Sequence, residues 1–335
     1  MPAPKTSRTA APPLGLVGDV GGTHARFALA RRLDGRMSIE QPFAYRVADY
    51  AGADEVVTAY LSRLNLETPP AFAVVAAAGP IGRGAVAFTN NAGWSLSEHR
   101  LAEVGGFKRA RLINDFTAQA LAIEHLRPAH LHRLGAPQDR PARGTAVVLG
   151  AGTGFGVAAR VDDGRARATL TGEGGHCGFS PGDDVEIEII RRLMARYGRV
   201  SIERVLSGPG LLNLYRILAD IRGEPAPFNA PDQVTGHALA GDRLSRLALD
   251  RFCAILGSVA GDFALAYGAE AGVYISGGIA PGILDCLAAS DFRRRFESKG
   301  RMSDYLKPIA TWVVLEPLAA LIGAASLLDE LASGA

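Results

Sequence analysis

The sequence predicts an α/β protein, built either as two domains around one cleft or as one large domain. The chain has 335 residues, which is too long for one small domain. Hydrophobic residues make up 48% of the chain, enough for a sizeable core. Short runs rich in β-branched residues interleave with segments of helical periodicity, and this alternation is typical of α/β layers.

The strands and helices can be assigned in chain order from these runs. Strand-like runs are Leu14–Val17, Phe27–Ala30, Ala71–Ala78, Ala85–Phe88, Arg111–Ile113, Thr145–Leu149, Val157–Arg160, Gly272–Ile275 and Thr311–Leu315. Helical periodicity predicts helices over Asp183–Tyr197 and Arg243–Tyr267, and a further helix after Pro317. The stretches His130–Arg143 and Gly223–Gln233 carry the composition of linkers.

Charge and cysteine content exclude several classes of protein. A net charge of +2 predicts neither a nucleic-acid surface nor a polybasic membrane patch, and no apolar run is long enough to span a bilayer. The first residues, MPAPKTSRTAAPP, lack the apolar middle of a secretory signal and predict a loose tail on a cytoplasmic protein. The widely spaced Cys177, Cys253 and Cys286 predict free thiols in a reducing compartment.

Two similar glycine-rich loops suggest an internal repeat. LVGDVGGTHARFALA and VVLGAGTGFGVAAR both read as strand, hairpin and strand, with Gly21, Gly22 and Thr23 at one turn and Gly152, Thr153 and Gly154 at the other. Glycines let the main chain approach an anion, and the turn amides then donate hydrogen bonds to it. Either loop alone is equally well explained as a tight hairpin. As the heads of two duplicated domains, the loops would face each other across a cleft.

Asp19, in the first of these loops, cannot contact phosphate without repulsion, but it can hold Mg²⁺ through water. Other nucleotide motifs do not fit. None of Lys5, Lys108, Lys299 and Lys307 lies in a GxxxxGK[ST] loop, and a strand-like run, not a helix, follows the second glycine loop.

A third glycine turn, SGGIAPG, begins at Ser276 after the run GVYIS. Its glycine pair, Gly277 and Gly278, leaves room for a flat ring against the backbone. A simple turn between a strand and a helix explains the same residues.

Polar residues at predicted strand ends form a candidate catalytic group. In LINDFTAQALA, Asn114 and Asp115 lie between a strand and a helix. A carboxylate there can take the proton of a hydroxyl that attacks a phosphoryl group. The alternative is that Asp115 is only a helix N-cap.

Further polar residues are suited to binding vicinal hydroxyls through hydrogen bonds. GEGGHCGF carries Glu173 and His176 between glycines, where Glu accepts and His donates or accepts hydrogen bonds. The alternative is a buried His and a surface Glu. Glu203, in IERVLSGPGLLNLY, has the alternative of a solvated charge at a helix end, and Asn90, in FTNNAGW, that of a turn residue. No second Cys/His pair stands at zinc-ligand spacing from His176.

The motifs LVGDVGGTHAR, FTNN…W, INDFTA, GAGTGFGVA, EGGH, ERVLSGPGLLNLYR and SGGI, in this order, resemble those of the bacterial glucokinases of the hexokinase–actin–Hsp70 ATPase superfamily. The resemblance covers nearly the whole chain from Leu14. It implies a two-domain actin-like ATPase fold (ribonuclease H-like) with a central cleft. It also implies a small domain of residues 14–115 with 317–335 and a large domain of residues 116–316.

The resemblance further implies ATP- and Mg²⁺-dependent phosphorylation of D-glucose at its 6-hydroxyl by a homodimer. Asp115 would be the general base. The implied sugar contacts are Asn90, Asn114, Asp115, Glu173, His176 and Glu203. The loops Asp19–Thr23 and Gly152–Gly154 would hold the phosphates, with Asp19 bound through water to Mg²⁺, and the turn of Ser276, Gly277 and Gly278 would lie near adenosine.

Some residues depart from the family pattern. His24 stands where an Asn often follows GGT, Cys177 stands where an acidic residue often follows EGGH, and FTNNAGW is one residue longer than usual. The zinc-binding cysteines of the related repressor–kinase family are absent, and no helix-turn-helix fits before the first strand, which favours a kinase. The open alternatives are a kinase for another hexose, a non-catalytic sugar sensor and an actin-like assembly protein.

Overall fold

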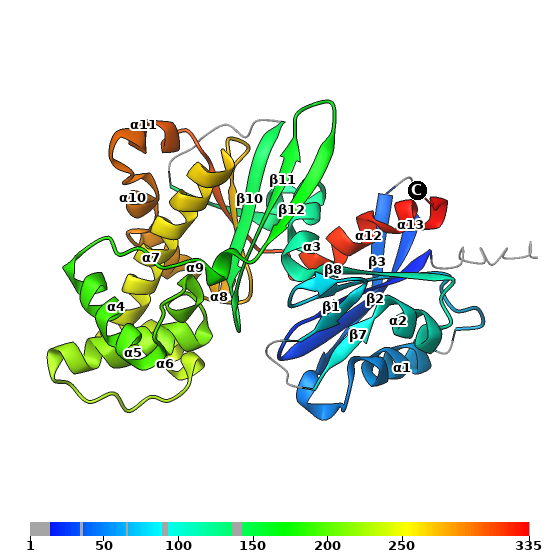
Figure 1. The fold of residues 1–335 in the computed structure, drawn as a ribbon, viewed down its shortest axis with the longest axis horizontal. Coiled ribbons are helices and arrows are strands. Elements are labelled where there is room, and N and C mark those ends of the chain that lie inside the picture. Colours follow the sequence, from blue (N-terminus) through cyan, green and yellow to red (C-terminus); the bar gives the residue numbers. More distant parts are fainter. Residues whose placement is uncertain (1–13, 34–35, 65, 89–92, 136–142, 335) are drawn as a thin grey trace, which may run out of the picture. The chain divides into compact units, whose positions relative to one another are not determined.

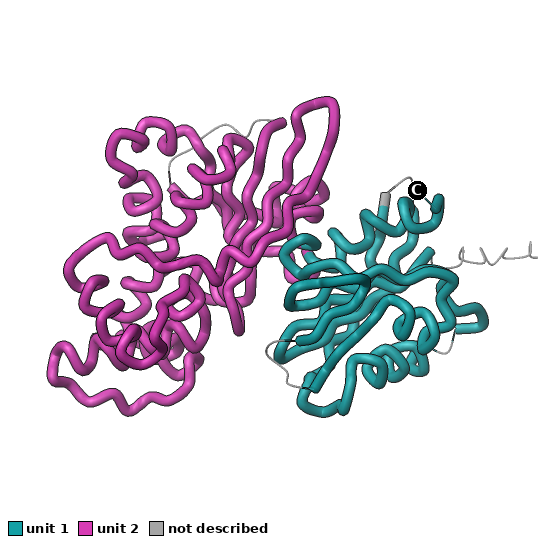
Figure 2. Tube along the Cα trace, viewed as in Figure 1, with its two compact units in different colours: residues 1–118, 320–335 teal, residues 119–319 magenta. Residues whose placement is uncertain are grey.

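The computed structural model describes residues 14–33, 36–64, 66–88, 93–135 and 143–334, which form two compact units (Figure 2). Unit 1 takes the described residues up to Ala118 together with those from Ala320 onward. Unit 2 takes Gln119–Ala319. The N-terminal tail and Asn90, both of which figure in the predictions, lie outside the described residues.

Unit 1 is built on a mixed sheet with the strand order β3–β2–β1–β4–β8 (Figure 1). Its strands are β1 (Gly15–Val20), β2 (His24–Leu33), β3 (Arg36–Arg46), β4 (Phe72–Ala77) and β8 (Arg109–Asn114). Strands β1, β2 and β3 pair antiparallel, whereas β4 and β8 continue parallel to β1. A smaller antiparallel sheet contains β5 (Ile81–Gly82), β6 (Ala85–Ala87) and β7 (Ser95–Ser97).

The main core of unit 1 lies on one face of this sheet. The helices of this part of the chain are α1 (Ala53–Leu64), α2 (Glu98–Gly105), α3 (Asp115–Ala122), α12 (Ala319–Ser326) and α13 (Leu328–Ser333). Successive strand residues point to opposite faces, so alternate strand residues such as Leu16 and Phe27 join Tyr60 of α1 and Leu101 of α2 in this core. Leu328 of α13 packs beside Gly15 of β1.

Unit 2 repeats the strand order and directions of unit 1. Its sheet order is β12–β11–β10–β13–β14–β9, with β9 (Leu131–Leu134), β10 (Gly144–Ala151), β11 (Phe155–Asp162), β12 (Arg167–Gly172), β13 (Val273–Ser276) and β14 (Thr311–Val314). The first three strands of this order pair antiparallel, and β13 and β14 continue parallel to β10. Strand β9 is added antiparallel at the edge.

Helices of unit 2 bury one face of its sheet. They are α4 (Asp184–Tyr197), α5 (Gly208–Arg222), α6 (Pro231–Leu239), α7 (Arg243–Tyr267), α8 (Ile279–Gly282), α9 (Leu284–Ala289), α10 (Phe292–Glu297) and α11 (Ser303–Leu306). The long helix α7 packs against α5, α6 and α10. A Cβ atom at Gly257 would lie 2.1 Å from the carbonyl oxygen of Phe292, so this glycine lets α7 approach the backbone of α10 closely.

The α/β prediction is confirmed, and each predicted strand overlaps an observed one. Both internal helix predictions are confirmed as α4 and α7, and the helix after Pro317 as α12 and α13. The prediction that His130–Arg143 is a linker was wrong for Leu131–Leu134, which forms β9. The sequence LHRL lacks a continuous apolar run because β9 is an edge strand that pairs only with β14.

The predicted linker Gly223–Gln233 was also too long, because α6 begins at Pro231. Several elements had no predicted counterpart. They include the helices α1, α2, α5, α6 and α10 and the edge strands β3 and β12. Both of these strands lie at a sheet edge, where burial on one side only leaves a weak apolar signal.

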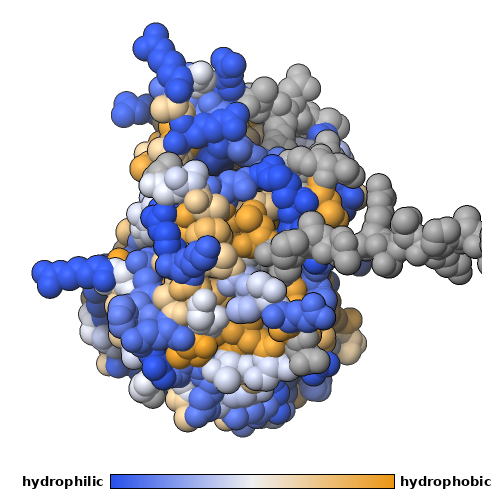
Figure 3. Space-filling model, turned by 90° about the vertical axis from the view of Figure 1, so that its right-hand side faces the viewer, coloured by the Kyte–Doolittle hydropathy of each residue, from blue (hydrophilic) through white to orange (hydrophobic). Residues whose placement is uncertain are grey.

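The face shown in Figure 3 is mainly hydrophilic, with small apolar patches between polar residues. Within the described residues, no helix is long and apolar enough to cross a membrane.

The three cysteines are free. Cys253 and Cys286 are buried, and burial raises the pKa of the Cys253 thiol to about 12. Across the described ranges, no cluster of three or more His, Cys, Asp or Glu side chains could hold a metal ion.

Candidate functional site

The carboxyl ends of β1, β4 and β8 lie side by side at one edge of the unit 1 sheet. Val20 is opposite Ala77, which is opposite Asn114, so β1 and β8 are roughly 10 Å apart, at two strand spacings. The Ala78 N–H donates to the Val20 carbonyl (3.0 Å), and Asn114 Nδ2 donates to the Gly79 carbonyl (3.3 Å). This edge therefore gathers Asp19, Asn114 and Asp115, and such carboxyl edges of α/β sheets are where ligands bind.

Asn114, not Asp115, takes the capping position of α3. Asn114 Oδ1 accepts hydrogen bonds from the N–H groups of Phe116 (2.9 Å) and Thr117 (3.2 Å). Asp115 is the first residue of the helix, is partly buried, and its Oδ1 accepts from the Phe116 N–H at 2.9 Å. Asp115 therefore lies in the first turn of α3, at the carboxyl end of β8, with its carboxylate bound to the helix backbone.

Asp19 is a partly buried carboxylate beside the first glycine hairpin, with 20% of its side chain exposed. It lies opposite Arg26 in the β1–β2 ladder, with Arg26 Nη1 3.7 Å from Asp19 Oδ2. Burial raises the pKa of the Asp19 carboxyl, and the Arg26 guanidinium offsets part of that shift. Burial takes solvating water away from the Asp19 carboxylate. A hydrated cation beside it would stabilise its negative charge, so this residue fits water-mediated Mg²⁺ binding.

One backbone amide of the hairpin that follows Asp19 donates a hydrogen bond within the turn. The Gly21 N–H donates to the His24 carbonyl at 2.9 Å, which closes the turn. Thr23 is exposed, and its carbonyl accepts from the Val47 N–H at 3.0 Å. The Gly21 amide is therefore engaged within the turn, which reduces the set of phosphate donors that the sequence predicted.

Asp19→Asn is expected to raise the free energy of unfolding at pH 7, because burial penalises the charged form that this variant lacks. Because the pKa of Asp19 is raised in the folded state, the folded wild type is destabilised at pH values above that pKa. The difference in the free energy of unfolding between Asp19→Asn and the wild type should therefore shrink as the pH falls. It should shrink through the folded-state pKa towards about 4, where the carboxyl group titrates in the unfolded chain. Urea unfolding at pH 7 and pH 4 measures this, with exposed Asp49→Asn as the matched control. A variant less stable than the wild type at pH 7 would contradict the expectation.

Two glycine turns lie on neighbouring parallel strands of unit 2. Strand β10 leads into Gly152–Gly154 and β13 leads into Ser276–Gly278, with Gly150 opposite Ser276. A Cβ atom at Gly150 would lie 1.9 Å from the Ser276 carbonyl oxygen, and one at Gly277 would lie 2.5 Å from the Ala151 carbonyl oxygen. Gly277 also has φ of +86°. The close approach of the two turns therefore requires glycine at both positions.

A pocket of about 620 Å³ opens beside these turns, wholly within unit 2. Its lining includes Gly152, Thr153, Pro231, Gly278, Ile279 and Ile283. The lining is mostly apolar, with turn backbone at one side. This combination suits a flat ring system that carries an anionic group.

Glu173 and His176 flank two buried glycines in the 3-10 turn η4 (Gly174–His176). A Cβ atom at Gly174 would lie 2.8 Å from the Phe263 and Val157 side chains, and one at Gly175 would lie 2.0 Å from the Phe155 carbonyl oxygen. The glycines therefore let the turn pack directly on β11. Both Glu173 and His176 are exposed, so the alternative of a buried His is wrong.

Glu203 is fixed beside the second glycine hairpin. It belongs to the 3-10 turn η5 (Ile202–Arg204), is partly buried, and its Oε2 accepts from the Phe155 N–H at 2.9 Å. The alternative of a solvated charge at a helix end is therefore wrong. Backbone bonds from Gly208 N–H to the Gly152 carbonyl (2.8 Å) and from Ile202 N–H to the Cys177 carbonyl (3.0 Å) join this segment to both neighbouring loops.

Two side chains at this site carried no signal in the sequence. Gln119 Oε1 accepts from Ser276 Oγ at 3.0 Å, and Arg199 Nη1 donates to the His176 carbonyl at 2.8 Å. Each bond joins segments that are far apart in the chain. Arg199 lies in no motif that points to chemistry, and Gln119, although it lies within LINDFTAQALA, was not singled out there, so only the folded chain reveals these contacts.

Known proteins match almost the full length of this chain. The glucokinase family model matches residues 16–331. A glucokinase from Caulobacter sp. (strain K31) is 52% identical over 312 residues, which cover 93% of this chain and 94% of that protein. The crystal structure of a glucokinase from an Antarctic psychrotroph has a TM-score of 0.82 and 36% identity, and covers 94% of this chain and 98% of its own.

A more distant structure has the same fold. The ROK family glucokinase from Streptomyces griseus, in complex with glucose and AMPPNP, has a TM-score of 0.65 at 17% identity, and covers 95% of this chain and 99% of its own. The match to the family model and the identity with the Caulobacter protein establish to which family this chain belongs. This chain belongs to the glucokinase family of sugar kinases.

Proposed function

We propose that this chain transfers the γ-phosphoryl group of ATP to the 6-hydroxyl of D-glucose, with Asp115 as the general base. Membership of the glucokinase family supports glucose as the phosphorylated sugar. The observation that carries the assignment of the base is the cap of α3. Asn114 fills the capping position, and Asp115 is held one residue further on, at the start of the helix.

We propose that the two units are the small and large domains of an actin-like ATPase, with boundaries at residues 14–115 plus 317–335 and 116–316. The shared order and direction of their strands support a duplicated domain of this type. The family resemblance further supports a homodimer in the cytoplasm.

The proposed sugar contacts are Asn90, Asn114, Asp115, Glu173, His176 and Glu203. The exposed Glu173 and His176 and the fixed Glu203 support this set, because they offer acceptors and an imidazole on neighbouring loops. A sugar that lacks a paired hydroxyl would leave these groups unsatisfied, which is the physical basis of selectivity.

The proposed nucleotide site uses Asp19, Gly21, Gly22 and Thr23 of unit 1 and the turns Gly152–Gly154 and Ser276–Gly278 of unit 2. The apolar pocket beside the latter turns supports binding of adenosine. The exposed Thr23 supports binding of phosphates; the Gly21 and Gly152 amides are engaged within their own turns, so these two glycines would serve by letting the main chain approach the anion. Mg²⁺, held through water by Asp19, would supply positive charge beside the phosphates.

In the proposed reaction, the Asp115 carboxylate takes the proton of the 6-hydroxyl as that oxygen attacks the γ-phosphorus. The new oxygen–phosphorus bond forms as the bond from phosphorus to the departing ADP oxygen breaks. Phosphoryl transfer depends mainly on positioning and charge stabilisation, so the fixed loops do most of the catalytic work.

Glu173→Gln is expected to raise the KM for glucose about tenfold, because a charged acceptor at the sugar becomes a neutral amide. The KM for ATP should change less than about twofold, because this residue lies outside the proposed nucleotide loops. Initial rates at varied glucose and varied ATP measure both constants. An unchanged KM for glucose would remove Glu173 from the sugar site.

The direct test couples the product to glucose-6-phosphate dehydrogenase and follows NADPH with purified protein, Mg²⁺, ATP and glucose. We expect NADPH to form in proportion to enzyme. A panel of hexoses, assayed by ADP release, separates glucokinase from a kinase for mannose, fructose or N-acetylglucosamine. If no sugar elicits ADP, the proposed function is wrong.

A further inference from the structure

Helix α4 is attached at both ends to the segment that carries the proposed sugar residues. At its C-terminal end, Arg199 follows the cap residue Gly198, and its Nη1 donates to the His176 carbonyl at 2.8 Å. At its N-terminal end, Glu186 Oε2 accepts from the Gly182 N–H at 2.6 Å. The stretch from His176 to Gly182 is therefore held at one end by Glu186 of α4 and at the other by Arg199, in the segment that follows α4, whose Val200 carbonyl also accepts from the Phe179 N–H at 3.1 Å.

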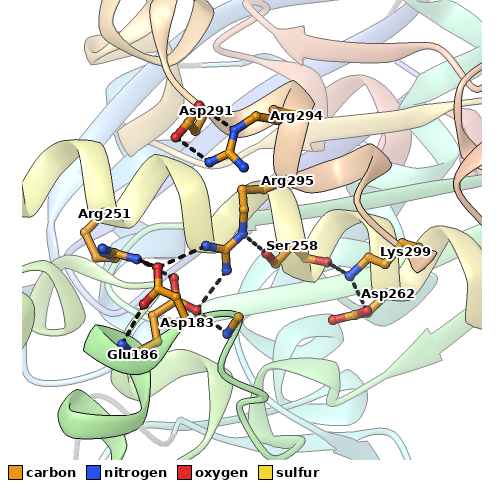
Figure 4. Close-up of polar contacts among 10 residues, drawn as sticks. Asp183, Glu186, Arg251, Ser258, Asp262, Asp291, Arg294, Arg295 and Lys299 are labelled. Atoms are coloured by element: carbon orange, nitrogen blue, oxygen red, sulfur yellow. Dashed lines mark hydrogen bonds and ion pairs between the residues drawn. The ribbon is translucent and has the colours of Figure 1, made fainter.

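The N-terminal attachment is part of a partly buried ion cluster of Asp183, Glu186, Arg251 and Arg295 (Figure 4). Glu186 is 0% exposed and Arg295 is 8% exposed. Arg251 Nη1 donates to Glu186 Oε1 at 2.9 Å, and Arg295 Nη2 donates to Glu186 Oε2 at 2.8 Å. Two carboxylates and two guanidinium groups balance, so the buried Glu186 and Arg295 are paired, while the Asp183 side chain remains 39% exposed.

This ion cluster joins three helices. Arg251 comes from α7 and Arg295 from α10, and both reach the first turn of α4 (Figure 4). Arg295 Nε also donates to Ser258 Oγ of α7 at 2.8 Å. Burial alone would raise the pKa of Asp183, but the Arg251 guanidinium and the Glu186 N–H bind its carboxylate and lower that pKa. The start of α4 is thus fixed to the core of unit 2.

We propose that α4 supports the sugar site: the ion cluster fixes the first turn of the helix, and Arg199, just beyond the C-terminal cap of the helix, positions His176. Arg199 and the residues of the ion cluster are positioning residues, since none of them has a proposed contact with substrate. The inference rests on the proposed role of His176 in glucose binding. A purely structural cluster would affect stability and leave the affinity of the folded protein for glucose unchanged.

Arg199→Met keeps an unbranched apolar stem but removes the donor to the His176 carbonyl. We expect the KM for glucose to rise about fivefold, the scale of one ordinary hydrogen bond, because Arg199 is exposed to solvent, with kcat and the KM for ATP within about twofold. Arg199→Lys retains a cationic donor and should recover most of the affinity. Arg191→Met is the matched control, because Arg191 is an exposed arginine of α4 that pairs with Glu188.

The second pair of variants tests the other end of the helix. Arg295→Met should lower the thermal midpoint and, in protein that circular dichroism shows to be folded, also raise the KM for glucose. Arg294→Met is the control from the same helix, because Arg294 is 65% exposed and pairs with Asp291. If Arg295→Met lowers stability with no change in the KM for glucose, the cluster has no positioning role.

Isothermal titration calorimetry with glucose measures the same effect without turnover. An inactive wild type would overturn the proposed function, whereas the comparison of Kd values would still test the supporting role of α4. An Arg199→Met variant with wild-type KM and Kd for glucose would overturn the proposal. So would a variant in which kcat and both KM values change together and Arg199→Lys restores nothing.

Discussion

Asp115→Asn is expected to lower kcat by about 10²- to 10⁴-fold, the usual contribution of a general base. Asparagine has nearly the same shape and keeps an oxygen that can accept from the Phe116 N–H, so α3 should still begin at this residue. It cannot take up the proton of the 6-hydroxyl. We therefore expect loss of turnover in a folded protein whose Kd for glucose, measured by calorimetry, changes by less than about tenfold.

The matched control for this variant is Asp184→Asn. Asp184 is likewise the first residue of its helix, α4, and follows a capping side chain, but it is exposed and lies outside the proposed site. It should leave kcat unchanged within about twofold, so any loss common to both variants would reflect helix N-terminal charge and not base catalysis. An Asp115→Asn enzyme with kcat within about tenfold of the wild type would reject Asp115 as the base.

Gly175→Ala is expected to lower kcat/KM for glucose by about 10²-fold, because small displacements of positioning groups have effects of this size. The added Cβ atom would lie 2.0 Å from the Phe155 carbonyl oxygen. The obstacle is backbone of β11, so no side-chain rotation can relieve it. The turn that carries Glu173 and His176 must therefore move away from the strand.

Gly178→Ala is the control from the same loop, because a Cβ atom there meets no atom within 4 Å. It should retain kcat/KM for glucose within about twofold, since an added methyl group in open space displaces nothing. Initial rates at low glucose, with circular dichroism to verify folding, compare the two variants. Equal activities would mean that the seating of η4 on β11 does not matter for catalysis.

The strongest sequence predictions came from local patterns that the tertiary structure preserved. The central strands β4 and β10 are buried apolar runs, and the long periodic segment of α7 ends at Gly268, which has φ of +60°. The repeat of GDVGGT and GAGTGF correctly indicated two hairpins at equivalent places in two similar sheets. These features depend on the residues of one segment, and so the sequence of that segment suffices to predict them.

Other features depend on partners far away in the chain. Strand β9 forms because β14, some 180 residues later, offers an edge, and its own residues carry little strand preference. The sequence left open whether Asp115 was a cap, and the hydrogen bonds of Asn114 decided that question. Asn90 lies outside the described residues, so its role stays a prediction.

By itself, the sequence predicted the α/β class, from the alternation of strand-like and helical runs, and the glycine hairpins, from two short contiguous motifs. Only the tertiary structure decided that Glu203 binds the start of β11, that Gly150 and Gly277 are required by backbone contact, and that Arg199 holds the His176 carbonyl. These contacts join segments brought together by burial of a common core. Burial is a property of the whole fold, and no local pattern of residues encodes which distant partner it will supply.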